Sequence, residues 1–151
     1  MLNNNFIENL LELQDVNVNK VENFEKEKII HCTLRKKPHK CPECGEITTT
    51  VHDYREQKIK DIPAWGKNVI ICLKKRRYRC KCGKRFQEKN SFLPKYHRMT
   101  NRLSTYIIDE LRNEYSFTSV AKSVNLSVST VIRVFDIISS QSKNIRYACN
   151  R

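Results

Sequence analysis

Two pairs of closely spaced cysteines constrain the fold of this chain more than any other feature. Cys41 and Cys44 form a C-x-x-C pair, Cys80 and Cys82 form a C-x-C pair, and a glycine directly follows each pair. Each pair can present two thiolates from one tight turn, and Zn²⁺ favours four sulfur ligands in a tetrahedron. Residues 45–79 separate the pairs, which is enough for a hairpin that brings the turns together. The sequence therefore predicts one structural Zn²⁺ ligated by Cys41, Cys44, Cys80 and Cys82.

Three alternatives compete with this interpretation. His39, His52 or Cys72 could replace Cys82 as the fourth ligand. A C-x-x-C pair can also form a redox-active disulfide, but the alternating strands and helices of a thioredoxin-like context are missing. Catalytic zinc needs an open coordination position and a general base, and no residue pattern marks either one.

The charge of the chain points to a polyanionic partner. The formal net charge is +13, and residues 32–99 contain nineteen Lys and Arg residues against six Asp and Glu residues. Such a surface attracts nucleic acid over a long range. The sequence contains no apolar run of the ~18 residues that a membrane span needs. The acidic start has no basic n-region, so we expect neither a signal peptide nor a membrane partner.

Hydrophobic spacing predicts a β-rich first part. A short amphipathic helix is expected at residues 4–14. Strands are expected around Val16 and Val18 and at Lys28–Leu34, joined as a hairpin around Asn23, and also at Thr48–Tyr54 and at Val69–Arg79. A turn carries Trp65, the only tryptophan, whose expected role is packing in the interior.

The spacing changes to a helical period from Thr100 onward. Leu103–Leu111 marks one helix, Ser116 is the expected N-cap of a short second helix, and Ser127 is the expected N-cap of a third. The third helix is predicted to bury Val131, Phe135 and Ile138. The order and lengths fit a helix-turn-helix.

These patterns predict an α+β chain. It consists of a small, β-rich, zinc-ribbon-like domain followed by an all-α helix-turn-helix domain. The expected divisions are 1–98 for the N-terminal helix, strands and zinc-binding β domain, 99–140 for the helix-turn-helix, and 141–151 for a tail.

Basic residues in both domains are candidate DNA contacts. Alternation would place Lys75, Arg77 and Arg79 on one face of their strand, and Lys74, Arg76 and Tyr78 on the other. Such a strand suits phosphate contacts, although a solvated edge strand would look the same. Residues at the start of the second helix of a helix-turn-helix enter the major groove. The predicted DNA-contacting side chains are Lys74, Lys75, Arg76, Arg77, Arg79, Lys84, Arg85, Ser129, Thr130 and Arg133. Trp65 and Tyr78 could also stack on the bases of a single strand.

Four segments carry a family resemblance: CPECG (41–45), DIPAWGKNVIICLKKRRYRCKCGKRF (61–86), FLPKYHRMTNRLS (92–104) and SVAKSVNLSVSTVIRVFD (119–136). Together they resemble the ISL-three family of bacterial insertion-sequence transposases, over about residues 6–138. Members of this family open with a zinc-binding domain and a helix-turn-helix, followed by a large catalytic domain with an acidic triad. The resemblance implies that this part binds the terminal inverted repeats of the element.

The catalytic part of the family pattern has no counterpart after Asp136. Two-metal phosphoryl transfer needs several carboxylates that converge on Mg²⁺. We therefore expect no enzyme activity, no small-molecule substrate, and either a truncated transposase or a DNA-binding fragment. The expected partners are double-stranded DNA at transposon ends and a second copy or a full-length transposase, in the bacterial cytoplasm. A protein-interaction or regulatory module that represses the element is the alternative.

Overall fold

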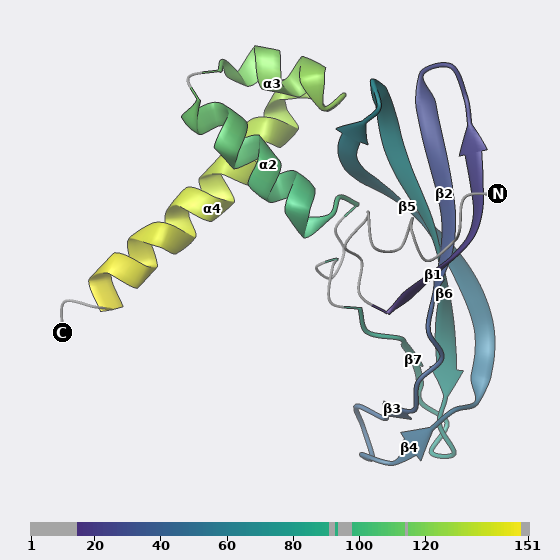
Figure 1. The fold of residues 1–151 in the computed structure, drawn as a ribbon. Helices are drawn as coiled ribbons and strands as arrows, with labels where there is room; N and C mark the ends of the chain where they lie inside the picture. Colours follow the sequence, from purple (N-terminus) through teal and green to yellow (C-terminus); the bar gives the residue numbers. More distant parts are fainter. Residues whose placement is uncertain (1–14, 91–92, 94–97, 114, 149–151) are drawn as a thin grey trace.

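A computed structural model describes residues 15–90, 93, 98–113 and 115–148. The helix predicted at residues 4–14 lies outside the described residues. Within them, a β-rich first part is followed by three helices, which agrees with the predicted order of a β domain and a helical domain. Figure 1 shows the strands and the helices as neighbouring layers.

One long sheet dominates the first part, with strand order β1-β2-β6-β5 and with β7 added beside β6. The predicted hairpin around Asn23 is confirmed, because β1 and β2 pair antiparallel. The long apolar and basic run forms β6, which is antiparallel to β5 on one side and parallel to β2 on the other. The strands of this sheet are β1 (Val16–Asn23), β2 (Glu27–Leu34), β5 (Val51–Ala64), β6 (Lys67–Arg79) and β7 (Arg85–Gln87).

The core of the sheet comes from alternate residues of neighbouring strands. Ile59 of β5 lies opposite Ile71 of β6, and both are fully buried. Ile30 of β2 also pairs with Ile71 and packs in the same apolar cluster. Period-two burial of branched residues is what fixes strand register when one face is covered.

The strand β5 runs ten residues beyond the predicted end at Tyr54, to Ala64. Its second half mixes charged residues with one buried isoleucine, which hides the strand pattern in the sequence. The turn to β6 is correctly predicted, and it consists of Trp65 and Gly66, both at positive φ. The expected burial of Trp65 is wrong. Its side chain is 57% exposed, because a residue at the tip of a two-residue hairpin turn points away from the sheet.

The helical part contains α2 (Asn101–Arg112), α3 (Phe117–Ser123) and α4 (Val128–Ala148). Thr100 and Ser116 cap α2 and α3, since each hydroxyl accepts the backbone N–H three residues on. The predicted cap Ser127 does the same for α4, where its Oγ accepts from the backbone N–H of Thr130 at 3.3 Å. The predicted caps Ser116 and Ser127 are confirmed, whereas α2 begins two residues before the predicted Leu103.

Two features of α4 differ from expectation. The buried stripe consists of Val131 and Val134 with Ile138 at its margin, whereas Phe135 is 39% exposed and contacts the ring of Phe117. The helix continues to Ala148, past residue 140 where a tail was expected, because no Gly or Pro interrupts it. None of the helices in the described part of the chain is long and apolar enough to cross a membrane.

Candidate metal centre and nucleic-acid interface

Each cysteine pair lies in a tight turn that connects two strands. The first cysteine turn, residues 41–44, connects β3 (His39–Lys40) to β4 (Ile47–Thr48). The second cysteine turn, residues 80–83, connects β6 to β7. Backbone bonds close both turns: Gly45 N–H donates to the Cys41 carbonyl at 3.1 Å, and Gly83 N–H donates to the Cys80 carbonyl at 3.0 Å. Both glycines have positive φ, which glycine adopts without steric cost, so each turn depends on the glycine that follows its cysteine pair.

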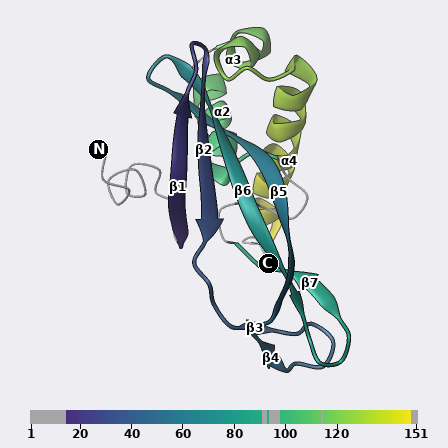
Figure 2. The ribbon, with the colours of Figure 1, turned by 90° about the vertical axis from the view of Figure 1, so that its right-hand side faces the viewer.

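The two cysteine turns meet at one end of the sheet (Figure 2). The sulfurs of Cys41 and Cys82 lie 3.7 Å apart, and those of Cys44 and Cys80 lie 3.5 Å apart. All four sulfurs lie within 4.8 Å of one another. Four sulfurs at ~2.3 Å from a central Zn²⁺ would be about 3.8 Å apart in a tetrahedron. The donor set and its spacing therefore fit a structural zinc ion.

The thiols of this cluster do not titrate alike. The backbone N–H of Cys44 favours the thiolate of Cys41 and lowers its pKa to about 7. The backbone N–H of Glu46 also favours the Cys44 thiolate, but the sulfurs of Cys80 and Cys82 outweigh it and raise the pKa of Cys44 to about 12. Four thiols this close cannot all ionise unless a cation lies between them. The cluster therefore has the electrostatics of a cation site.

The other candidate ligands lie outside this cluster. Cys72 is buried in β6 opposite Lys58 of β5. His39 packs against Tyr78 with their ring centroids 4.6 Å apart and their planes tilted by 50°, and burial lowers the pKa of its imidazole. His52 lies on the exposed part of β5. Among the described residues, the structure thus brings Cys82 to the other three cysteines and brings none of the alternatives there.

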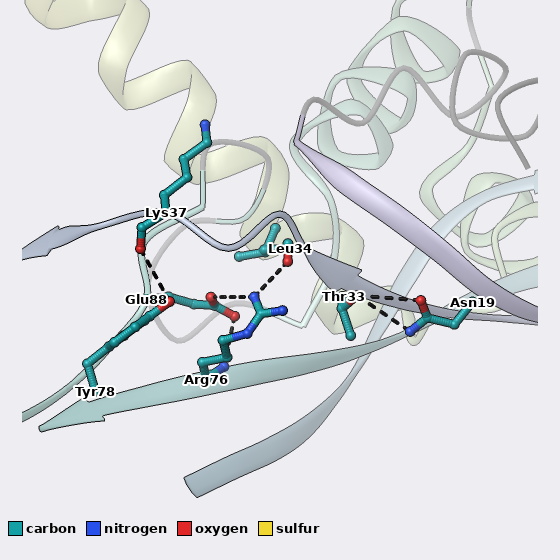
Figure 3. A network of polar contacts seen from close by, with 7 residues as sticks. All are labelled: Asn19, Thr33, Leu34, Lys37, Arg76, Tyr78 and Glu88. Carbon is teal, nitrogen blue, oxygen red and sulfur yellow. Dashed lines mark hydrogen bonds and ion pairs between the residues drawn. The ribbon is translucent and has the colours of Figure 1, made fainter. Parts of the chain in front are cut away.

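One predicted DNA contact, Arg76, forms its hydrogen bonds inside the protein (Figure 3). Its Nη1 donates to the Leu34 carbonyl at 2.6 Å and to Glu88 Oε2 at 3.3 Å. Its backbone N–H also donates to Glu88 Oε1 at 2.8 Å, and Glu88 is only 4% exposed. The phenol of Tyr78 on the same strand is fully buried, so it is closed to base stacking. Arg76 therefore holds β6 to the end of β2 and to the segment after β7.

The central basic residues of β6 are half-buried against β5. Arg77 pairs with Asp53 at 2.7 Å, and burial lowers the pKa of Lys75. Lys75 lies directly opposite Arg55. Arg55 is not among the predicted DNA contacts, because the strand was expected to end at Tyr54. Like charges opposite each other destabilise a sheet, and a bound anion would relieve that cost. Recognition that the strand continues beyond Tyr54 would have identified Arg55 as a candidate.

The remaining basic candidates of the first part are exposed. Lys74 and Arg79 lie on β6, Lys84 directly follows the second cysteine turn, and Arg85 is the first residue of β7. The Lys74 ammonium lies 5.0 Å from the ring of Tyr54. Lys84 pairs with Glu43 across the two cysteine turns at 2.7 Å, and that hydrogen bond raises the pKa of its ammonium. These four side chains reach solvent, and Arg79, Lys84 and Arg85 lie next to the second cysteine turn.

The helix-turn-helix is built on a tight turn between α3 and α4. Asn125 takes the left-handed conformation with φ 52°, and the Leu126 N–H donates back to the Ala121 carbonyl at 2.9 Å. Ser129 and Arg133 are exposed, and the helical period puts them opposite the buried Val131 and Val134. Thr130 is half-buried, and its hydroxyl lies 2.8 Å from that of Ser127. The exposed face of α4 thus carries Ser129 and Arg133.

Comparison with known protein families agrees with both halves of this structure. Residues 37–83, which contain both cysteine turns, match the zinc-finger of transposase IS204/IS1001/IS1096/IS1165. Residues 88–137, which contain the three helices up to the middle of α4, match the helix-turn-helix domain of transposase family ISL3. The chain carries the zinc-finger and helix-turn-helix modules of ISL3-family transposases. The resemblance stated from the sequence is confirmed.

One curated relative supports the same family. The transposase for insertion sequence element IS1001 of Bordetella parapertussis is 28% identical over 92 residues. The match covers 60% of this chain and 22% of that transposase, so it concerns about a fifth of the relative. No solved structure matches this chain significantly. Transposase-family zinc-finger and helix-turn-helix modules indicate a DNA-binding protein with a structural zinc site.

Proposed function

We propose that this chain binds duplex DNA at the ends of an insertion sequence, as the terminal-repeat-binding part of a transposase. The observation that carries the proposal is the exposed face of α4, which presents Ser129 and Arg133 opposite a buried stripe and directly after a tight turn. In a helix-turn-helix this face enters the major groove. A guanidinium there can bind the O6 and N7 atoms of guanine with two hydrogen bonds. The place of binding in this proposal is the bacterial cytoplasm.

In this proposal the zinc-binding domain supplies backbone contacts. Cys41, Cys44, Cys80 and Cys82 would hold one Zn²⁺, which links the two cysteine turns and so fixes the basic residues beside them. The exposed side chains suited to phosphates are Lys74, Arg79, Lys84 and Arg85, together with Arg55 and Lys75 on the sheet. Phosphate contacts of this kind add affinity for every sequence and position the protein on the duplex.

The experiment is selection from a random duplex pool with zinc-loaded protein at near-physiological salt. We expect one enriched motif, whose enrichment is lost in Arg133→Ala and kept in Arg112→Ala. Arg112 is a matched control because it is an exposed arginine on the neighbouring helix α2, paired with Asp109. Arg79→Glu should weaken binding to all sequences alike. Retention of DNA without any enriched motif would contradict site-specific recognition and leave only a backbone clamp.

A second candidate function, pairing with another transposase chain, rests on the apolar residues of α4. Ile132 and Ile137 are 41% and 45% exposed, and α4 extends away from the sheet beyond α2 and α3 (Figure 1). Exposed apolar residues that together form a contiguous patch are a common mark of a protein interface. Light scattering on the free protein would distinguish the two, because a stable dimer that forms without DNA favours this second function.

A further inference from the structure

The helices are joined to the sheet at the end of β5. Lys60 of β5 forms backbone bonds with the segment just before α2: its N–H donates to the Arg98 carbonyl at 2.8 Å, and its carbonyl accepts from Thr100 N–H at 3.0 Å. Met99, between these residues, pairs with Lys60 as an isolated parallel bridge. The chain thus adds one short rung to the edge of β5 immediately before the first helix begins.

Next to this rung, a buried carboxylate binds the start of α2. Asp61 is 2% exposed. Its Oδ1 accepts from Thr100 Oγ1 at 2.7 Å and from Arg102 Nε at 2.7 Å, and its Oδ2 pairs with Arg102 Nη2. Thr100 is also the N-cap of α2, so one carboxylate fixes both the cap and the first turn of the helix. Because two nitrogens of the Arg102 guanidinium bind the same carboxylate, this ion pair also fixes the relative orientation of the two side chains.

Two further contacts reach the helix-turn-helix itself. Lys60 Nζ donates to the carbonyl of Asn125 at 2.6 Å, and Asn125 belongs to the turn between α3 and α4. Ile62 of β5 packs against the buried apolar cluster of the three helices. The end of β5 is therefore attached to the first helix, to the turn and to the helical core.

These contacts lie between the two regions that carry the proposed DNA contacts. The cysteine turns lie at one end of the long sheet and α3 lies near its other end in both ribbon views (Figures 1 and 2). Along β5, Asp53 beside the basic part of β6 and Asp61 at the junction are eight residues apart. At ~3.3 Å per residue this is about 26 Å, which is the length of about eight base pairs.

We propose that Asp61 is a positioning residue for DNA binding, which holds the helix-turn-helix on the sheet at a fixed distance and orientation. Asp61 itself touches no DNA in this arrangement. It acts through Arg102 and Thr100, so that the phosphate contacts of the zinc-binding domain and the base contacts of α4 meet one duplex in a single register. The DNA part of this inference rests on the proposed function, whereas the rigid junction does not.

The rigid junction is tested first, without DNA. Residual dipolar couplings of the zinc-loaded full chain report whether the sheet and the helices share one alignment. We expect one alignment tensor for the unmodified protein and for Asp109→Asn, and two different tensors for Asp61→Asn. Asp109→Asn is the matched control because it removes another aspartate–arginine pair, exposed and within α2. Arg102→Lys, which keeps the charge but loses the two-nitrogen contact, is the milder variant if Asp61→Asn fails to fold.

The DNA part is tested with the selected motif and a version carrying five extra base pairs between the two protected segments. Five base pairs are about half a helical turn, so they move one segment to the opposite side of the duplex. We expect at least tenfold weaker binding of the unmodified protein to the longer site. Asp61→Asn should bind the original site at least fivefold more weakly than Asp109→Asn does, and should distinguish the two sites less than threefold.

The results bear separately on the junction and on the DNA contacts. Two alignment tensors in the unmodified protein would overturn the rigid junction. One shared tensor in Asp61→Asn would overturn the role of Asp61 in that junction. Equal affinity of the unmodified protein for both spacings would overturn the positioning role. A single tensor in a protein that selects no DNA motif would refute the proposed function and leave the junction standing.

Discussion

Replacement of Cys82 by serine tests the metal centre at its least regular position. The second cysteine turn has one residue fewer between its cysteines than the first, yet the sulfur of Cys82 lies 3.7 Å from that of Cys41. Four-ligand structural zinc sites bind with an apparent free energy of about 10–16 kcal/mol near pH 7. If the four sulfurs contribute comparably, removal of one costs about 2.5–4 kcal/mol, which is about 60- to 700-fold in zinc affinity.

The assay is competition for zinc against a chromophoric chelator, with metal content measured on the purified protein. Cys72→Ser is the control, because Cys72 is a buried thiol in the sheet outside the cluster. We expect a loss of two to three orders of magnitude in Cys82→Ser and a nearly unchanged affinity in Cys72→Ser. An unchanged zinc affinity in Cys82→Ser would refute the assignment and the geometric reasoning behind it.

Two further predictions concern stability. Trp65→Asn should raise the free energy of unfolding by about 0.5–1 kcal/mol, because Trp65 has φ 55° in a turn that favours Asn-Gly, and this outweighs the lost contact with the Lys28 ammonium. A lower melting temperature in this variant would contradict that reasoning. Ile107→Ala should destabilise the helices by about 2–5 kcal/mol, since Ile107 is fully buried in their core. Denaturant unfolding measures that change, zinc affinity serves as the control, and a loss below about 1 kcal/mol would count against it.

Local signals in the sequence explain the two cysteine turns and the helix starts. The spacing of the cysteines and the glycine after each pair are properties of tight turns, so residues close in sequence determine them. The same holds for Thr100, Ser116 and Ser127 at the helix starts, where each hydroxyl binds a backbone N–H three residues on. Hairpin pairing of β1 with β2 is equally local.

The errors arose where burial depends on distant residues. The second half of β5 carries charged side chains on one face, and only pairing with β6 reveals it as a strand. Trp65 has the composition of a core residue, but its place at a hairpin tip exposes it. Phe135 was expected in the buried stripe, but the packing of α3 and α2 selects Val134 instead.

The sequence singles out the candidate residues for the chemistry: four cysteines, a basic strand and a helix-turn-helix with Ser129 and Arg133 on its second helix. The tertiary structure decided which of them are available. Arg76 is unavailable for DNA because it binds Glu88 and Leu34, which lie on other segments of the chain. It also decided how the two domains are joined, through Asp61 and Arg102, which are 41 residues apart in the chain. Ion pairs between distant residues leave no periodic pattern in a sequence, because only the folded chain brings their charges together.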